Sequence, residues 1–222
     1  MAVITISREM GSGGAEVGRH VAHSLGYDYL DKNIIEGIFR QYGLTRFDDL
    51  YTSMPSILDV FSETNVLIIS MVNEIMEAVA QRGNAVIVGR GGFAIVGHYV
   101  EVLNVRIQAP IEVRVQRTQA AYNLDSPQEA EARVNADDKI RRRFLQMYYN
   151  KRWEDTADFD LILDTGSLSI EAAAQQIVDA VRAMAQKPPD PNAVTTASIE
   201  VDPVLADAVA KVLAFPLPPR HG

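Results

Sequence analysis

The chain has 222 residues, 47% of them hydrophobic, and a formal net charge of −8. This length suits one domain, or one domain with an appendage, and the apolar content can supply its core. The acidic balance argues against general nucleic-acid binding, which usually needs a basic surface, so local arginines would have to hold any anionic ligand. Because the chain contains no cysteine, disulfides and thiolate metal sites are excluded.

The sequence gives no sign of export or of a membrane. Met1 leads straight into a strand-like run without a signal-peptide pattern. No apolar stretch approaches the ~18 residues that a membrane-spanning helix needs. The four histidines have no metal-ligand spacing, so we predict no protein metal site. We expect a cytoplasmic protein without membrane contact.

The first predicted elements are a strand at residues 3–7 and a helix at residues 14–25. The strand is rich in β-branched residues, and the turn that links it to the helix contains Gly11, Ser12, Gly13 and Gly14. Backbone N–H groups in such a turn, together with the positive end of the helix dipole, can cradle a phosphate. The alternative is a turn that merely connects strand to helix.

The turn departs from the phosphate-binding pattern G-x-x-x-x-G-K-[ST]. The lysine of that pattern would fall near Gly14, where the chain has no cation. Arg8, just before the turn, and Arg19, at least one helical turn after it, are the nearest residues that could replace the lysine. The chain is therefore predicted to hold a phosphate group without the usual charge.

Strand-like runs and helical patterns alternate along the rest of the chain. The further strand candidates are residues 27–30, 85–88, 102–108 and 159–163. The helix candidates are residues 68–81, 111–121 and 169–185. This alternation predicts βαβ units, that is, a parallel sheet with helices on both faces. Ligands would then bind beyond the carboxyl ends of the strands, where the glycine-rich turn also lies.

Arg90 directly follows Gly89 at the end of a predicted strand, and Gly91 comes next. A guanidinium at the carboxyl end of a strand can grip a phosphate with two parallel hydrogen bonds. The flanking glycines let a ligand come close, which favours this interpretation over an arginine on a solvated turn. Asp31 follows the shorter strand at the same edge, either as a ligand-binding residue or as the N-cap of the next helix.

Two segments interrupt the alternation. Residues 31–63 are mainly helical and are predicted to form a small flap, whereas residues 125–153 are charged and helical. The second segment carries the densest basic cluster: Lys139, Arg141, Arg142 and Arg143. One interpretation is a solvated helix whose charges form ion pairs at i,i+4 spacing. Each such pair stabilises a helix by only ~0.2–0.5 kcal/mol. The alternative is a mobile lid that brings arginines over phosphoryl groups, with Trp153 stacked on a base or packed as an anchor.

The composition changes beyond residue 186. Residues 187–191 form a proline-rich linker, and Asp202 and Pro203 are typical of an N-cap and a first helical position. An apolar stripe at helical spacing follows, formed by Leu205, Ala208, Val209, Val212 and Leu213. We expect this stripe to pack against the chain's own core or against a second copy in a homo-oligomer.

The parts in this order resemble the nucleoside monophosphate kinases, specifically the cytidylate kinase-like family of P-loop proteins. The resemblance spans about residues 1–186 and rests on residues 4–9 with 11–14, 29–32, 86–91, 109–114, the basic segment and 161–170. It implies a three-layer α/β fold with a five-stranded parallel sheet, a monophosphate-binding flap and a lid. Residues 187–222 would be a linker and a helical appendage outside this domain.

The resemblance also implies roles for the candidate residues, with ATP and Mg²⁺ as the phosphoryl donor. Gly11, Ser12, Gly13 and Gly14 would cradle the ATP phosphates. Arg90 and Gly91, with Asp31 of the flap, would hold the monophosphate. Arg142 and Arg143 of the lid, together with Arg8, would stabilise the transferring group.

Two departures from true cytidylate kinases bear on activity and on selectivity for cytosine. The loop lacks its lysine, and Val88 and Gly91 stand where acidic residues flank the arginine that matches Arg90. We expect phosphoryl transfer to a nucleoside monophosphate such as CMP or dCMP, at a reduced rate. The alternatives are a regulatory module that binds nucleotide without turnover and a phosphotransferase for a non-nucleotide substrate.

Overall fold

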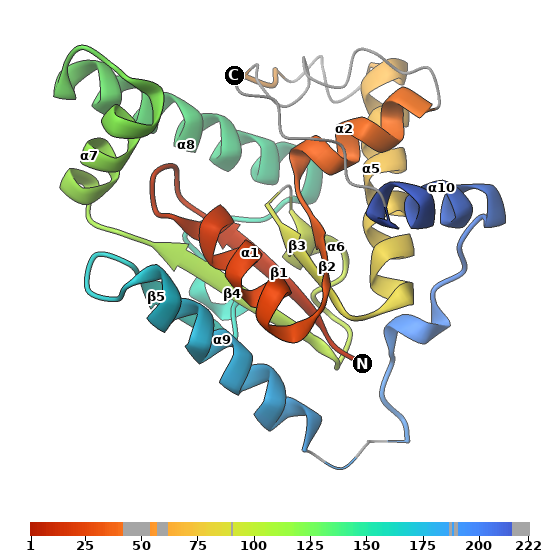
Figure 1. The fold of residues 1–222 in the computed structure, drawn as a ribbon. Coiled ribbons are helices and arrows are strands. Elements are labelled where there is room, and N and C mark those ends of the chain that lie inside the picture. Colours follow the sequence, from red (N-terminus) through yellow and green to blue (C-terminus); the bar gives the residue numbers. More distant parts are fainter. Residues whose placement is uncertain (42–53, 57–61, 90, 187, 189–190, 215–222) are drawn as a thin grey trace.

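The structure is a computed structural model that describes residues 1–41, 54–56, 62–89, 91–186, 188 and 191–214 (Figure 1). Its sheet has five parallel strands in the order β2-β3-β1-β4-β5, with the first strand of the chain at the centre. The strands are β1 (Val3–Arg8), β2 (Asp28–Leu30), β3 (Ala85–Val88), β4 (Val102–Gln108) and β5 (Leu161–Asp164). The predicted parallel sheet is confirmed.

Helices alternate with these strands as expected. The described helices are α1 (Gly14–Leu25), α2 (Lys32–Gln41), α5 (Glu63–Arg82), α6 (Gly92–Ile95), α7 (Ile111–Tyr122), α8 (Pro127–Tyr149), α9 (Ile170–Ala185) and α10 (Pro203–Ala214). Side-chain caps fix the starts of α8 and α9, because Ser126 accepts from the Glu129 N–H and Ser169 accepts from the Ala172 N–H. Much of the predicted flap, residues 42–53 and 57–61, lies outside the described residues.

The last strand begins later than the sequence predicts. Phe159 was expected to start it, but this residue closes a 3-10 turn at Thr156–Asp158 through a hydrogen bond from its N–H to the Thr156 carbonyl. Asp160 then joins the sheet edge, where its carboxylate accepts from the Asn104 N–H at 2.7 Å. Regular pairing with β4 starts only at Leu161.

Side chains of the central strand alternate between two apolar layers, as the period of two in a strand requires. Ile4 and Ile6 point into the layer formed with α1 and α9, whereas Val3 points into the layer that contains α5. In Figure 1, α1 and α9 lie side by side in front of the sheet. The result is the expected three-layer α/β architecture.

The C-terminal helix α10 packs on the chain's own core. Leu205, Val209 and Val212 are buried in the same apolar cluster as residues of α2 and α5. Figure 1 shows the chain leaving α9 and crossing to the side of the molecule where α5 stands. On the way, the Gln81 side chain donates to the Ile199 carbonyl at 2.7 Å. No helix in the described part of the chain is long and apolar enough to cross a membrane.

We expect Val209→Asp to destabilise the protein by several kcal/mol, because it places an unpaired carboxylate at a site with 0% exposure. The matched control is Val204→Asp on the same helix, where the native side chain is 67% exposed. That variant carries the same added charge and should change the free energy of unfolding by no more than ~0.5 kcal/mol. Denaturant unfolding measures both; equal effects would show that α10 does not contribute to the stability of the core.

Candidate active site

The glycine-rich loop lies at the carboxyl end of β1 and opens α1. Gly11 and Gly13 have φ of 76° and 75°, a left-handed conformation that favours glycine. Among the described residues, none accepts a hydrogen bond from the N–H groups of Gly11, Gly13 or Gly14. These donors, at the positive end of the helix dipole, form an arrangement suited to binding an anion.

Ser12 belongs to the internal structure of the loop. Its side chain is fully buried, and the hydroxyl donates to the Glu9 carbonyl at 2.9 Å. Its own carbonyl accepts from Thr165 Oγ1 at 2.7 Å, which ties the loop to the end of β5. Ser12 can therefore contribute its backbone to a ligand, while its hydroxyl is already engaged.

A buried ion network fixes the other side of the loop. Glu9 lies 3.7 Å from Arg106 of β4 and 3.5 Å from Arg114 of α7. Arg114 in turn pairs with Asp138 of α8 at 2.5 Å. The second Asp138 oxygen accepts from the Met10 N–H of the loop at 2.9 Å. Two carboxylates and two guanidiniums thus neutralise one another where water is largely excluded.

The three consecutive arginines of α8 differ in their partners and in their exposure. Arg141 is held against the end of β1, where it donates to the Arg8 carbonyl at 2.9 Å and pairs with Asp137 at 2.7 Å. Arg142 is half-exposed and lies 3.6 Å from Glu154. Arg143 donates to the Pro55 carbonyl at 3.3 Å. The structure therefore places Arg141 in contact with the loop segment, whereas Arg142 and Arg143 lie farther out.

A cavity opens between the carboxyl ends of β1 and β3 and the inner side of α8. Its polar and glycine lining includes Ser7, Arg8, Gly89, Gly91, Arg141 and Trp153. Arg142 and Arg143 line an adjoining open depression with Lys139, Lys151 and Arg152, and Trp153 belongs to both linings. The two hollows bring several guanidiniums together at the carboxyl end of β1, where the glycine-rich loop begins.

Trp153 is an anchor. It is buried, and its indole N–H donates to the Ser7 hydroxyl at 2.8 Å. The guanidinium of Arg106 lies 5.3 Å from the ring centroid, and that of Arg142 lies 5.9 Å from it on the open side. The anchoring alternative for this residue is thus the one observed.

Gly91, which was predicted to contact the monophosphate, lies beneath the end of α8. Its φ is 84°, and a Cβ at this position would come within 2.7 Å of the Tyr149 ring. Burial raises the pKa of Tyr149 above its usual range, so the hydroxyl stays protonated and donates to Asn73 at 2.8 Å. Arg90 itself lies outside the described residues.

Asp31 acts as the N-cap of α2. Its Oδ1 accepts from the N–H groups of Asn33 at 2.9 Å and Ile34 at 3.2 Å. Next to it, burial raises the pKa of Tyr29 to about 12, an effect that Arg19 and Arg8 oppose. Arg19 thus lies near Tyr29. Arg8 lies against the loop, because a Cβ on Gly14 would be 2.5 Å from the Arg8 Cβ.

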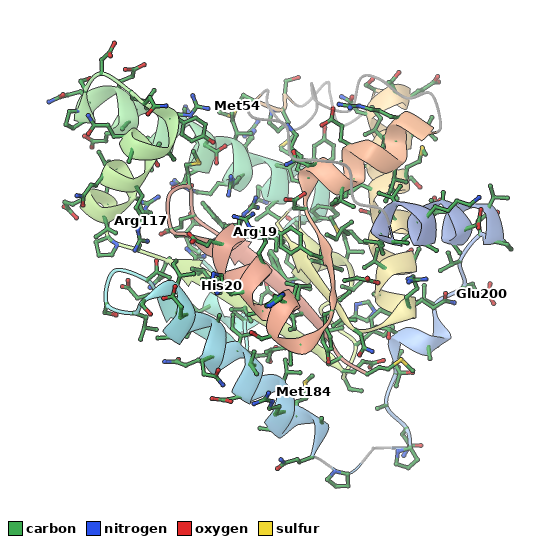
Figure 2. All side chains as sticks on the ribbon, viewed as in Figure 1. Arg19, His20, Met54, Arg117, Met184 and Glu200 are labelled. Carbon is green, nitrogen blue, oxygen red and sulfur yellow. The ribbon has the colours of Figure 1, made fainter. Side chains whose placement is uncertain are left out.

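Arg117 is a further cation at the loop that sequence reasoning missed (labelled in Figure 2). It donates to the Thr165 hydroxyl at 3.0 Å and to the Thr165 carbonyl at 2.9 Å. One of its nitrogens lies 3.8 Å from the position that a Cβ on Gly13 would take. The sequence offered a signal for Arg106, because it is the one charged residue of β4, which is mostly apolar. It offered none for Arg114, Arg117 or Asp138, which lie in helices that contain many charged residues.

Protein ligands for a metal ion are sparse at the loop. The described part of the chain contains no group of three or more His, Asp or Glu side chains that could hold a metal. Ala15 stands where the phosphate-binding pattern has the Ser or Thr that contacts Mg²⁺. Mg²⁺ keeps most of its waters and binds readily to phosphate oxygens, so it fits here as a companion of a bound triphosphate.

We expect Asp138→Ala to lower the free energy of unfolding by about 3–5 kcal/mol, because Arg114 and the Met10 N–H would lose their partner. Glu131→Ala is the matched control, since it removes the same charge from an exposed position of α8. It should change stability by no more than ~0.5 kcal/mol. Urea unfolding gives both values, and a small effect of Asp138→Ala would contradict the structural role of the network.

Comparison with known proteins agrees with this architecture. The chain is 28% identical over 179 residues to a cytidylate kinase of Pyrobaculum aerophilum, covering 81% of this chain and 92% of the relative. It is 26% identical over 183 residues to a cytidylate kinase of Methanothrix thermoacetophila, covering 82% of this chain and 99% of the relative.

Solved structures show the same fold. An uncharacterized protein from Eubacterium ventriosum matches with a TM-score of 0.67 at 21% identity, over 82% of this chain and 98% of that one. A shikimate kinase from Bacteroides thetaiotaomicron matches with a TM-score of 0.50 at 16% identity, over 82% of this chain and 98% of that one. At these identities the likeness concerns the fold alone.

The family comparison supports nucleotide kinase activity and matches the part of the chain that forms the sheet, the loop and α8. The model of the Cytidylate kinase-like family aligns with residues 3–167, which include all five strands and the cavity lining. On this match, the chain belongs to the cytidylate kinase-like family.

Proposed function

We propose that the protein transfers a phosphoryl group from ATP, with Mg²⁺, to a nucleoside monophosphate, and that CMP or dCMP is the first acceptor to test. The observation that carries the proposal is the set of N–H groups at Gly11, Gly13 and Gly14 that find no acceptor within the described part of the chain, close to an arginine-lined cavity. Phosphoryl transfer depends mainly on positioning and charge stabilisation, and these are the properties that such a site offers. The choice of base rests on the names of the relatives.

The two substrates would occupy neighbouring parts of the site. The loop would hold the ATP phosphates through its N–H groups, with Mg²⁺ neutralising their charge. Arg90 and Gly91, which follow β3 closely in the sequence, would hold the monophosphate from the other side, near the flap that starts at Asp31. The acceptor and donor phosphates would then meet at the carboxyl edge of the sheet, where ligands of this fold class bind.

The arginines around the cavity would stabilise charge during transfer. Arg8 and Arg141 line the cavity itself, and Arg142 and Arg143 line the adjoining depression. The side chain of Arg142 is half-exposed and pairs only with the exposed Glu154 among the ion pairs of the described residues, so a bound phosphoryl group would compete with that carboxylate for it. Because the loop lacks its lysine, we expect turnover slower than in an enzyme with the full pattern.

A second candidate is a regulatory module that binds nucleotide without turnover. The observation that favours it is the loop sequence after Gly13. Gly14 replaces the lysine of the phosphate-binding pattern, and Ala15 replaces its Ser or Thr, so the loop lacks both the cation and the hydroxyl. The two candidates differ in one measurable respect: both bind nucleotide with Mg²⁺, and only the kinase forms ADP.

We expect the wild-type chain to form ADP from ATP in the presence of Mg²⁺ and CMP or dCMP, in a coupled assay over a panel of monophosphates. Arg142→Ala should lower kcat by roughly 10²–10³-fold if this residue stabilises the transferring group. Arg182→Ala on α9, an exposed arginine away from the cavity, is the control and should keep the wild-type rate. Nucleotide binding without ADP formation for any acceptor would favour the regulatory module.

We expect Arg90→Ala to weaken monophosphate binding by about 10–100-fold, because a bidentate charge-assisted contact is lost. ATP affinity should stay within about threefold of wild type, since the loop holds the donor separately. Calorimetric titration of each nucleotide alone separates the two effects. Equal loss for both ligands, or for neither, would contradict an acceptor role for Arg90.

A further inference from the structure

Arg8 and Gly14 share one space in the structure. A Cβ on Gly14 would lie 2.5 Å from the Cβ and 2.9 Å from the Cγ of Arg8, too close for any side chain. The φ of Gly14 is outside the left-handed region, so the backbone alone does not require glycine there. The Arg8 side chain is therefore the nearest obstacle to a side chain at position 14.

The same two positions are linked in the phosphate-binding pattern G-x-x-x-x-G-K-[ST]. When Gly13 is aligned with the second glycine of the pattern, Arg8 takes the place of the first glycine and Gly14 takes the place of the lysine. The pattern has a small residue at the first position and a long cation at the other. In this chain the small residue and the cation have exchanged positions.

The Arg8 head group reaches the cavity. Its guanidinium lies against Gly89 at the end of β3, in the space that a Cβ on Gly89 would fill. Arg8, Gly89 and Arg141 all line the cavity beside the loop. The side chain therefore runs from the start of α1 to the carboxyl edge of the sheet and brings its charge to the place where phosphates would meet.

We propose that Arg8 supplies the phosphate-binding cation that the pattern takes from its lysine, and that residue 14 is glycine because the Arg8 side chain crosses it. The phosphate role rests on the proposed function. The packing relation between residues 8 and 14 does not, so a stability measurement tests it independently of any ligand.

The packing relation is tested by a double-mutant cycle of Arg8→Gly and Gly14→Ala, read as melting temperatures. In the wild-type background, Gly14→Ala should lower the Tm by roughly 3–10 °C, because the new Cβ overlaps Arg8. In the Arg8→Gly background, which removes both the Cβ and the Cγ of residue 8, the same substitution should lower it by less than about 2 °C, since the space is free. Equal shifts in the two backgrounds would overturn the packing relation.

The phosphate role is tested by calorimetric titration of ATP with Mg²⁺. Arg8→Ala should weaken ATP binding by about 10–100-fold. The double variant Arg8→Gly with Gly14→Lys rebuilds the glycine and lysine positions of the pattern and should restore affinity to within about threefold of wild type. Arg82→Ala, at the far end of α5 and paired with Asp28, is the control and should bind as wild type does.

The outcomes separate this proposal from the proposed function. Unchanged ATP affinity in Arg8→Ala would overturn the phosphate role of Arg8 while leaving the kinase proposal intact. No recovery in a folded Arg8→Gly, Gly14→Lys variant would show that the positions do not exchange roles. A wild-type chain that binds no nucleotide would overturn the proposed function, and with it the phosphate role of Arg8.

Discussion

The position of the glycine-rich loop depends on the carboxylate of Asp138. One oxygen accepts from the loop at the Met10 N–H, and the other pairs with Arg114, which also lies beside Glu9. Because Asp138 is 2% exposed, losing these partners would leave an uncompensated charge in the interior, which costs folding free energy. A residue from the middle of α8 thereby fixes the loop, and the loop fixes the start of α1.

This constraint also decides which arginine of α8 reaches the site. Arg141 follows Asp138 by three residues, so both lie on the same side of the helix. When Asp138 is held against the loop, Arg141 is carried to the end of β1 and into the cavity lining. A lid movement that pulled Asp138 away from the loop would break its buried pair with Arg114. A movement limited to exposed side chains of α8, such as Arg142, would leave that pair intact.

Local patterns in the sequence were enough to predict the sheet, its helices and the glycine-rich loop. The β-branched run at residues 3–7 and the glycines after it are short-range signals, and the structure places the strand and the loop as expected. The partners of the loop were not predictable in this way, because Asp138 lies 128 residues from Met10 and pairing at that distance leaves no local signal. One helical clue was present: Val134, Asp138, Arg141 and Leu145 recur at the spacing of a single face, which could have ranked Arg141 above Arg142 and Arg143.

Trp153 gives the protein an optical property of its own. It is the only tryptophan in the chain, and its indole forms part of the wall between the cavity and the basic depression. The near-ultraviolet emission of the folded protein at tryptophan wavelengths therefore originates at one point, buried beside Ser7 and close to two guanidiniums. A change in polarity or charge on either side of that wall reaches this one indole, so the tryptophan emission of the unlabelled protein reports on the site.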